Sequence, residues 1–342
     1  MISIGVVGYG YWGPNLVRNF MENEDLQVTM VADLKPENLA KAKKRYPSLR
    51  TTSRPEDLLE DPSLQAIAIA TPVFTHFDLG LKALKAGKHV FMEKPLASNS
   101  QEAYQLVQEA ARRGLVLFVD HTFLYTGAVR KIKEMVATGK LGKVHYYDSV
   151  RVNLGLFQHD INVLWDLAVH DLSIMDHLLD RRPTAISATG IAHVPKEPEN
   201  IAYLTCFFED DLIAHIHANW LAPVKIRKTL IGGDKQMIVY DDVEPTEKVK
   251  VYDKGITLTG DPEGLYKMLV SYRLGDVWSP KLDTTEALSL EADAFAEAIL
   301  KGSRPLSDGV AGLRIVHILE AASRSMAQKG NPVTLDWKQF GL

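Results

Sequence analysis

Short apolar runs alternate with helical patterns over the first 120 residues. The runs are rich in β-branched residues and apolar at consecutive positions, which is typical of strands buried on both faces of a parallel sheet. Their alternation with helices predicts a doubly wound parallel sheet with right-handed crossovers. The predicted strands are Ile2–Val7, Gln27–Ala32, Ala66–Ala70, His89–Met92 and Val116–Val119, and the predicted helices are Asn15–Glu22, Pro36–Arg45, His76–Ala86 and Ser100–Arg112.

The pattern changes after about Asp120, where strand-like runs follow one another with few helices between them. Consecutive strands indicate an antiparallel sheet. We therefore expect an α/β chain of two domains, a parallel-sheet domain over 1–120 and an α+β domain over 121–342 with a large, mostly antiparallel open sheet. The predicted strands are Val144–Asn153, Ala185–Ala192, Ala202–Phe208, Ile213–Trp220 and Arg227–Gly232, the predicted helices are Ala128–Thr138, Val163–Leu179, Ala287–Lys301 and Gly309–Met326, and Asp241–Pro262 is expected to form hairpins and loops.

Composition excludes several classes of protein. A chain of 342 residues has room for two domains, and 46% hydrophobic with 24% charged residues is ordinary for a soluble globular protein. No apolar run is long enough to span a bilayer, and Met1–Val7 resembles a strand more than a signal peptide. The single cysteine, Cys206, excludes an intrachain disulfide and fits a reducing cytoplasm. With a net charge of −4 and no basic stripe, neither nucleic acid nor a membrane is an expected partner.

A G-x-G-x-x-G motif, Gly8 to Gly13, follows the first predicted strand and opens a helix. In that context Gly8 permits the tight turn, Gly10 lets the backbone approach a pyrophosphate, and Gly13 lets the helix pack close to the strand. The helix N-terminus would present N–H groups to the phosphates. We therefore predict a Rossmann dinucleotide site that also includes Tyr11 and Trp12, and a glycine-rich structural turn is the alternative.

Asp33 ends the second predicted strand, 25 positions after Gly8. A carboxylate there is expected to bind the ribose hydroxyls and to repel a 2′-phosphate, so NAD is favoured over NADP. Lys35 lies close enough to leave NADP open. The alternative for Asp33 is a helix N-cap, because Leu34-Lys35-Pro36 could start a helix.

The sequence Glu93-Lys94-Pro95 follows the predicted strand His89–Met92. Charged residues at the carboxyl end of a parallel strand point into the ligand crevice. Lys94 held there could polarise a substrate oxygen and stabilise a developing alkoxide. The X–Pro bond in this loop can be cis at modest cost.

Asp166 and His170 stand at i and i+4 in a predicted helix, so they share one face. Oxidation of an alcohol needs a base for the hydroxyl proton while hydride leaves carbon, and histidine suits this because its pKa lies near 7. Asp166 could orient the substrate or raise the basicity of the site. The alternatives are a solvated polar helix face, or a metal site built from the nearby His and Asp residues, which no His-Glu-x-x-His or cysteine set supports. We expect no metal.

These motifs together resemble the glucose–fructose oxidoreductase / inositol dehydrogenase (Gfo/Idh/MocA) family. The resemblance covers nearly the whole chain. It is carried by the early glycine motif, Ala70-Thr71-Pro72 with His76, Gly87–Pro95, Asp166-Leu167-Ala168-Val169-His170-Asp171, Ser307-Asp308-Gly309, Gly312-Leu313 and Leu319-Glu320-Ala321-Ala322.

The resemblance implies an NAD(P)-dependent dehydrogenase acting on CH–OH groups, in which Lys94 works with Asp166 and His170. It also implies cofactor contacts from Thr71, Pro72, His76, Glu93 and Lys94. A homodimer or homotetramer formed through the open sheet of the second domain is implied as well, and an exposed sheet face needs cover on physical grounds.

Within the family, the chain looks like the UDP-N-acetylglucosamine / UDP-N-acetylglucosaminuronate 3-dehydrogenase branch, which oxidises the sugar C3 hydroxyl in making polysaccharide sugars. The segments His121–Tyr125, Ala128–Lys133, Arg151–Gln158 and Asp160–Leu167 carry this likeness.

This branch adds Arg151 and Asn153 as candidate substrate contacts, beside Asp166 and His170. His121, which follows the fifth predicted strand, is a further candidate, with a hydrogen-bonded core histidine as the alternative. Lys94, Arg130, Arg151 and Arg227 are candidates to meet a diphosphate or carboxylate, with ordinary salt bridges as the alternative for each arginine. Thr126-Gly127 departs from the Asn-Pro common in the branch. A dehydrogenase or ketoreductase of a free polyol or another activated sugar, and a non-catalytic dinucleotide sensor, remain alternatives.

Overall fold

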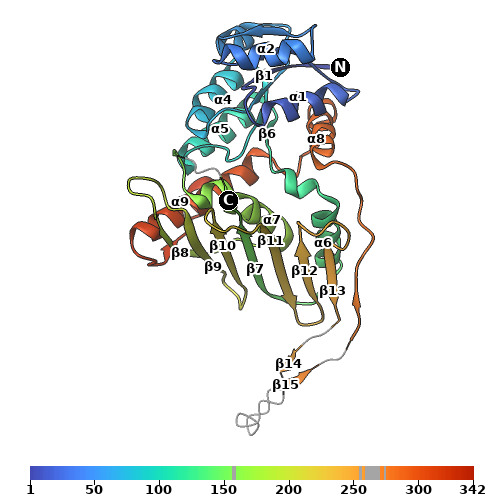
Figure 1. The fold of residues 1–342 in the computed structure, drawn as a ribbon, viewed down its shortest axis with the longest axis vertical. Helices are drawn as coiled ribbons and strands as arrows, with labels where there is room; N and C mark the ends of the chain where they lie inside the picture. The colour runs from blue at the N-terminus through green and yellow to red at the C-terminus, as the bar shows by residue number, and fades with distance from the viewer. Residues whose placement is uncertain (156–158, 254–255, 259–269, 273–274) are drawn as a thin grey trace. The chain divides into compact units, whose positions relative to one another are not determined.

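The computed structural model describes residues 1–155, 159–253, 256–258, 270–272 and 275–342. The chain divides into two compact units (Figure 1). The first unit comprises Met1–Thr126 and Thr285–Glu320, and the second comprises Gly127–Thr284 and Ala321–Leu342. The predicted boundary at residue 120 differs from this division, because a C-terminal segment returns to the first unit.

The first unit is built on a six-stranded parallel sheet of order β3-β2-β1-β4-β5-β6. The strand order reverses between β1 and β4, which is where open α/β sheets bind ligands, outside the carboxyl ends of the strands. The inner strands are buried along nearly their whole length, as their continuous apolar runs predict. The strands are β1 Ile2–Val7, β2 Leu26–Ala32, β3 Arg50–Thr52, β4 Ala66–Ile69, β5 His89–Met92 and β6 Leu117–Val119.

Helices connect these strands, and their ends follow local sequence signals. Prolines stand in the first turn of α1, α2 and α3, where the missing N–H costs nothing. Helix α5 begins where the Asn99 side chain accepts from the Glu102 N–H, and it ends at Gly114 with φ +65°. The helices are α1 Gly13–Glu22, α2 Pro36–Arg45, α3 Pro55–Glu60, α4 His76–Lys85 and α5 Ser100–Arg113, with 3₁₀ turns η1 Val73–Thr75 and η2 Thr122–Tyr125.

An aromatic cluster explains why α8 (Ala287–Lys301) belongs to the first unit. Phe295 of α8 is completely buried and contacts three rings from the N-terminal part of the chain. Its ring centroid lies 5.5 Å from that of Phe91, 5.7 Å from that of Phe118 and 6.5 Å from that of Phe20. The core of the parallel sheet is therefore completed by a helix nearly 170 residues after its last strand.

The second unit is built on a nine-stranded sheet of order β16-β13-β12-β11-β7-β10-β9-β8-β17. The pair β7–β10 is parallel and its other pairs are antiparallel, so the expectation of a mostly antiparallel sheet is confirmed. Its strands are β7 Val144–Val152, β8 Ala185–Ile191, β9 Ile201–Phe207, β10 Ile213–Asn219, β11 Ile226–Gly233, β12 Met237–Asp241, β13 Val249–Tyr252, β16 Val277–Trp278 and β17 Val333–Thr334, and β14 Ile256–Leu258 pairs separately with β15 Val270–Tyr272.

Helices α6 (Gly127–Ala137) and α7 (Val169–Leu179) pack against each other, and α7 lies against β7. Helix α9 (Gly309–Ala327) runs through the boundary between the two units, and the 3₁₀ turn Lys338–Phe340 lies near the C-terminus. In the described part of the chain, no helix is long and apolar enough to cross a membrane. Hairpins predicted over Asp241–Pro262 are present at β12–β13, and residues 254–255 and 259–262 lie outside the described residues.

Candidate functional site

The glycine motif forms a tight cradle between β1 and α1. Gly8 has φ +98°, and a Cβ there would lie 2.4 Å from the Ala70 carbonyl oxygen. A Cβ on Gly13 would lie 2.0 Å from the Gly8 carbonyl oxygen, so the helix approaches the strand as the motif predicts. At Gly10 a Cβ would meet no described atom within 4 Å, which leaves room for a ligand above the backbone. These residues fit the pyrophosphate of a dinucleotide, at a helix N-terminus where no described side chain forms a cap.

Asp33 lies beside this cradle at the end of β2. Its Oδ2 accepts from the Tyr9 N–H at 2.6 Å, which ties it to the glycine motif, and also from Asn38 Nδ2 at 3.2 Å. Its Oδ1 accepts from the Lys35 N–H at 2.8 Å. The N-cap position of α2 is Lys35, so the alternative of Asp33 as the helix N-cap is wrong. Each carboxylate oxygen can accept more than one hydrogen bond, so Asp33 retains capacity for ribose hydroxyls.

His76 contacts the backbone of two loops at the carboxyl edge of the sheet. It is fully buried, with Nε2 2.8 Å from the Thr71 carbonyl oxygen and Nδ1 2.8 Å from the Pro95 carbonyl oxygen. Burial lowers the pKa of His76, with the nearby Lys94 ammonium acting in the same direction. Pro72 follows Thr71 as an exposed residue of the same loop. His76 therefore holds together the two loops that carry the predicted cofactor residues.

Glu93 and Lys94 follow β5, and the Lys94–Pro95 bond is cis. Burial raises the pKa of Glu93 well above its usual range, and the neighbouring Asp120 carboxylate raises it further. Asp120 in turn accepts from Trp12 Nε1 at 2.6 Å and from the Thr122 hydroxyl. Trp12 of the glycine motif is thus fastened to the end of β6, while Tyr11 is 92% exposed.

Asp120 was missed as a functional candidate, and so was Glu291 of α8. Both are buried, and burial raises the pKa of Glu291 well above its usual range, followed by the effect of Asp120. The position of Asp120 at the end of a parallel strand is a signal that could have found it. Glu291 carries no such signal, because nothing in a C-terminal helix indicates which sheet it covers.

His121 lies in the core of the first unit. It is 1% exposed, and neither ring nitrogen has a hydrogen-bond partner among the described residues. Burial lowers its pKa to about 4, so the ring is neutral at physiological pH. A contact between His121 and substrate stays a prediction.

Asp166 and His170 lie on one helical segment of the second unit, but its first turn is not an α-helix. Residues Leu164–Ala168 form a π-helical turn, and α7 begins only at Val169. The expected α-helix over Val163–Leu179 is therefore wrong in its first turn, where the i→i+5 spacing of a π-turn widens the coil. Single π-turns inside helices are frequent at functional sites. Asp166 accepts from Trp220 Nε1 at 3.0 Å, a partner that the sequence did not indicate.

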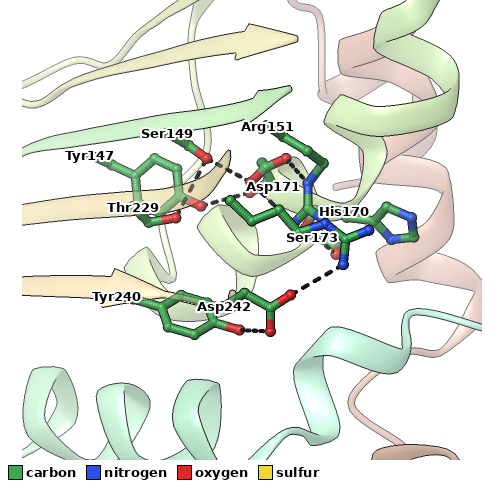
Figure 2. A network of polar contacts seen from close by, with 10 residues as sticks. Tyr147, Ser149, Arg151, His170, Asp171, Ser173, Thr229, Tyr240 and Asp242 are labelled. Carbon is green, nitrogen blue, oxygen red and sulfur yellow. Dashed lines mark hydrogen bonds and ion pairs between the residues drawn. The ribbon is translucent and has the colours of Figure 1, made fainter. Parts of the chain in front are cut away.

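Each arginine proposed to meet an anion has a carboxylate partner within the second unit. Arg151 pairs with Asp171 at 2.6 Å, with both side chains 3% exposed (Figure 2). The other two pairs are Arg130 with Asp283 at 2.9 Å and Arg227 with Asp242 at 3.2 Å.

Two further positions of the predicted substrate region can be placed. Asn153 directly follows β7, and its N–H donates to the Asn219 carbonyl oxygen at 3.0 Å. Gly127 is required by packing, since a Cβ there would lie 2.0 Å from the Asp283 carbonyl oxygen. Leu156, Phe157 and Gln158, which contribute to the branch likeness, lie outside the described residues. Lys94 belongs to the first unit, whereas Asp166 and His170 belong to the second.

Comparison with known protein families accounts for both units. Residues 2–121 match the oxidoreductase family with an NAD-binding Rossmann fold, and residues 129–239 match the GFO/IDH/MocA C-terminal domain. An uncharacterised oxidoreductase of Escherichia coli, YdgJ, is 34% identical over 261 residues, which are 72% of this chain and 73% of that protein.

Two characterised relatives act on different alcohols. Myo-inositol 2-dehydrogenase of Thermotoga maritima is 24% identical over 96% of this chain and 97% of its own length. UDP-N-acetylglucosamine 3-dehydrogenase of Acidithiobacillus ferrooxidans is 26% identical over 91% of this chain and 93% of its own length. A solved structure of the dehydrogenase of that name and organism superposes with a TM-score of 0.80 at 24% identity, covering 95% of this chain and 98% of that one.

Proposed function

Because this chain belongs to the GFO/IDH/MocA oxidoreductase family and is an NAD(P)-dependent dehydrogenase acting on CH–OH groups, we propose that it oxidises the C3 hydroxyl of a sugar nucleotide. The substrate class is UDP-N-acetylglucosamine or its uronate. The observation that carries the chemistry is that Asp166 and His170 lie on one helical segment of the second unit, with Asp166 in its π-turn, while the first unit carries a cofactor cradle.

The residues divide the chemistry among them. His170 takes the proton of the substrate hydroxyl as general base. Asp166, whose carboxylate is oriented by the Trp220 indole N–H, positions the hydroxyl and supports that proton transfer. Lys94 stabilises the negative charge that develops on the substrate oxygen. The nicotinamide, when bound, supplies the acceptor for the hydride.

The substrate proposal is supported by the segments around His121, Arg151 and Asp160 and by the 26% identity to a UDP-N-acetylglucosamine 3-dehydrogenase. A free polyol is the second candidate, because the inositol 2-dehydrogenase is 24% identical over nearly the whole chain. Absorbance of reduced nicotinamide distinguishes them, with NAD and UDP-N-acetylglucosaminuronate, UDP-N-acetylglucosamine, myo-inositol or glucose, and 2-oxoglutarate as a possible recycling acceptor. Reduction with only the nucleotides supports the proposal, and reduction with only the free polyols overturns it.

We expect Lys94→Ala to lower turnover by on the order of 10²-fold or more, since one positioned electrostatic donor contributes about that much. His170→Asn should lower it at least as far, because the general base is removed. NAD affinity, measured by titration of the bound cofactor, separates a chemical defect of His170→Asn from a binding defect. Exposed Lys85 on α4 provides a control, Lys85→Ala, which should leave turnover unchanged. Full turnover of Lys94→Ala would remove Lys94 from the mechanism.

A homodimer or homotetramer is part of the same proposal. The outward-facing positions of β9 and β10 include Tyr203, Phe207 and Ile213, which are 46%, 37% and 46% exposed. Exposed apolar side chains on a sheet face favour burial against another surface. Light scattering of the purified protein measures the mass of the assembly.

A further inference from the structure

We propose that Arg151 and Asp171 are positioning residues that lock the first turn of α7, and with it His170, onto strand β7. This inference rests on the proposed function, because it gives His170 the role of general base. It differs from the expectation that Arg151 binds substrate, and it assigns Asp171 a role for the first time.

Asp171 is the buried centre of a polar network (Figure 2). Its Oδ2 accepts from Arg151 Nε at 2.6 Å, and its Oδ1 accepts from the Ser149 hydroxyl at 2.6 Å, with Arg151 Nη2 3.4 Å away. Burial acts to lower the pKa of Arg151, but the Asp171 carboxylate outweighs it and the pKa is raised. The Arg151 guanidinium therefore stays charged in the interior.

A third contact comes from the same strand. The Tyr147 hydroxyl donates to the Asp171 backbone oxygen at 3.0 Å, and burial raises the pKa of Tyr147 well above its usual range, so the phenol keeps its proton. Tyr147, Ser149 and Arg151 are alternate residues of β7, and alternate residues of a strand face the same side. Three successive inward-facing side chains thus bind one residue of α7, both at its side chain and at its backbone.

The network contacts α7 at its N-terminal end, next to the irregular π-turn. Asp171 lies in the first turn of α7, directly after the π-turn that carries Asp166, and Ala168 provides no side-chain cap. The neighbouring residue is His170, whose backbone oxygen accepts from the Ser173 hydroxyl at 2.8 Å. A change of register at the π-turn would rotate His170, and the three contacts from β7 oppose that rotation.

Stability alone does not require such a pair. Two buried charges lose much solvation, and apolar residues of similar size often serve stability as well. The pair instead fixes the orientation of the Asp171 side chain, because a carboxylate that accepts from Arg151 Nε and Ser149 at once has one orientation. Pre-organisation of this kind matters for a base, since a misplacement of about 1 Å can cost on the order of 10²-fold in rate.

Charge-changing variants test the proposal against a purely structural role. Asp171→Asn removes the negative charge beside His170 and leaves Arg151 positive, so His170 should protonate at lower pH. Arg151→Met leaves Asp171 negative, so His170 should protonate at higher pH. The double variant removes both charges and should return the titration toward the wild type. The charged and ionisable groups Asp166 of the π-turn, Tyr147 of β7, Tyr240 of β12, Asp242 after β12 and Arg227 of β11 are unchanged in all three variants.

Two readouts are used on the full-length protein. The imidazole titration of His170, followed by NMR and assigned with His170→Asn, needs no substrate. The kcat and the acidic limb of the pH profile are measured with NAD and whichever compound of the substrate panel is oxidised. We expect kcat of Asp171→Asn to fall on the order of 10²-fold, with KM for NAD unchanged. Asp148→Asn, on the outward face of the same strand, is the matched control and should change neither readout.

The outcomes are separable from those of the proposed function. If Arg151→Met does not fold, Asp171→Asn alone tests the positioning role, since asparagine keeps the shape of the aspartate side chain. A folded Asp171→Asn with normal kcat and an unshifted His170 titration overturns the positioning role while His170→Asn remains inactive. Full activity of His170→Asn instead overturns the proposed base and this inference with it.

Discussion

At the residue scale, buried carboxyl groups near the cofactor cradle need their protons. Asp120 accepts from the Trp12 indole and the Thr122 hydroxyl. Glu291 lies beside it without exposure to water, so burial and then the Asp120 carboxylate raise its pKa. A neutral Glu291 avoids a second buried negative charge beside Asp120, which holds Trp12 of the glycine motif.

This protonation makes stability depend on pH. A raised pKa in the folded state means that the unfolded chain ionises first, so Glu291 lowers stability as pH rises above about 4.3, its ordinary value. We expect Glu291→Gln, which keeps a donor without ionising, to be more stable than the wild type at pH 7. The difference should vanish below pH 4 in urea unfolding. Glu291→Leu, which lacks the donor, is the control, and a Gln variant that is less stable at pH 7 would contradict a neutral Glu291.

At the element scale, two glycines of the β1–α1 turn have different roles. Gly13 is required by packing, whereas Gly10 leaves room for the ligand. A Cβ on Gly13 meets the Gly8 carbonyl oxygen at 2.0 Å, whereas a Cβ on Gly10 meets no described atom within 4 Å. We expect Gly13→Ala to lower the thermal midpoint and weaken NAD binding together, because α1 must move. Gly10→Ala should leave the midpoint of the cofactor-free protein unchanged but weaken NAD binding, because only the ligand approaches there. Equal midpoints of the two variants without NAD would contradict this assignment.

Elements with strong periodicity were predictable from sequence, and the exceptions have physical reasons. Strand β3 (Arg50–Thr52) and helix α3 (Pro55–Glu60) were missed because three and six residues are too short to show a period. The π-turn at Leu164–Ala168 was read as an α-helix, since both place Asp166 and His170 near one face. The glycine motif needed no tertiary context, because its spacing and its position after a strand are both local.

At the scale of the whole molecule, sequence predicts the two kinds of sheet but not which one the C-terminal helices join. The helices α8 and α9 were expected near their observed bounds, yet their sequences do not specify a partner. For α8 the partner is determined by Phe295, whose ring packs against Phe91 and Phe118 of the parallel sheet. Residues brought together over long distances, such as Glu291 with Asp120 or Asp171 with Arg151, escape sequence reasoning for the same reason.

Packing of α8 against the parallel sheet should contribute measurably to stability. We expect Phe295→Ala to destabilise the protein by about 3–5 kcal/mol, the usual cost of a buried phenylalanine, because the cavity opens among Phe20, Phe91 and Phe118. Leu300→Ala removes an apolar side chain from the same helix at a position 54% exposed, so it should cost no more than about 0.5 kcal/mol. Urea unfolding gives both values.

Hydrogen exchange then locates the loss. Since Phe295 packs within the first unit, Phe295→Ala should reduce protection in peptides of β1, β4, β5 and β6, while peptides of β7, β9 and β10 keep theirs. NAD should restore part of the lost stability, because the cradle that binds it lies on the same sheet and ligand binding to the native state adds to its stability. Loss of protection centred on β7 to β10 would mean that α8 supports the second unit instead, and the division of the chain into units would have to be redrawn.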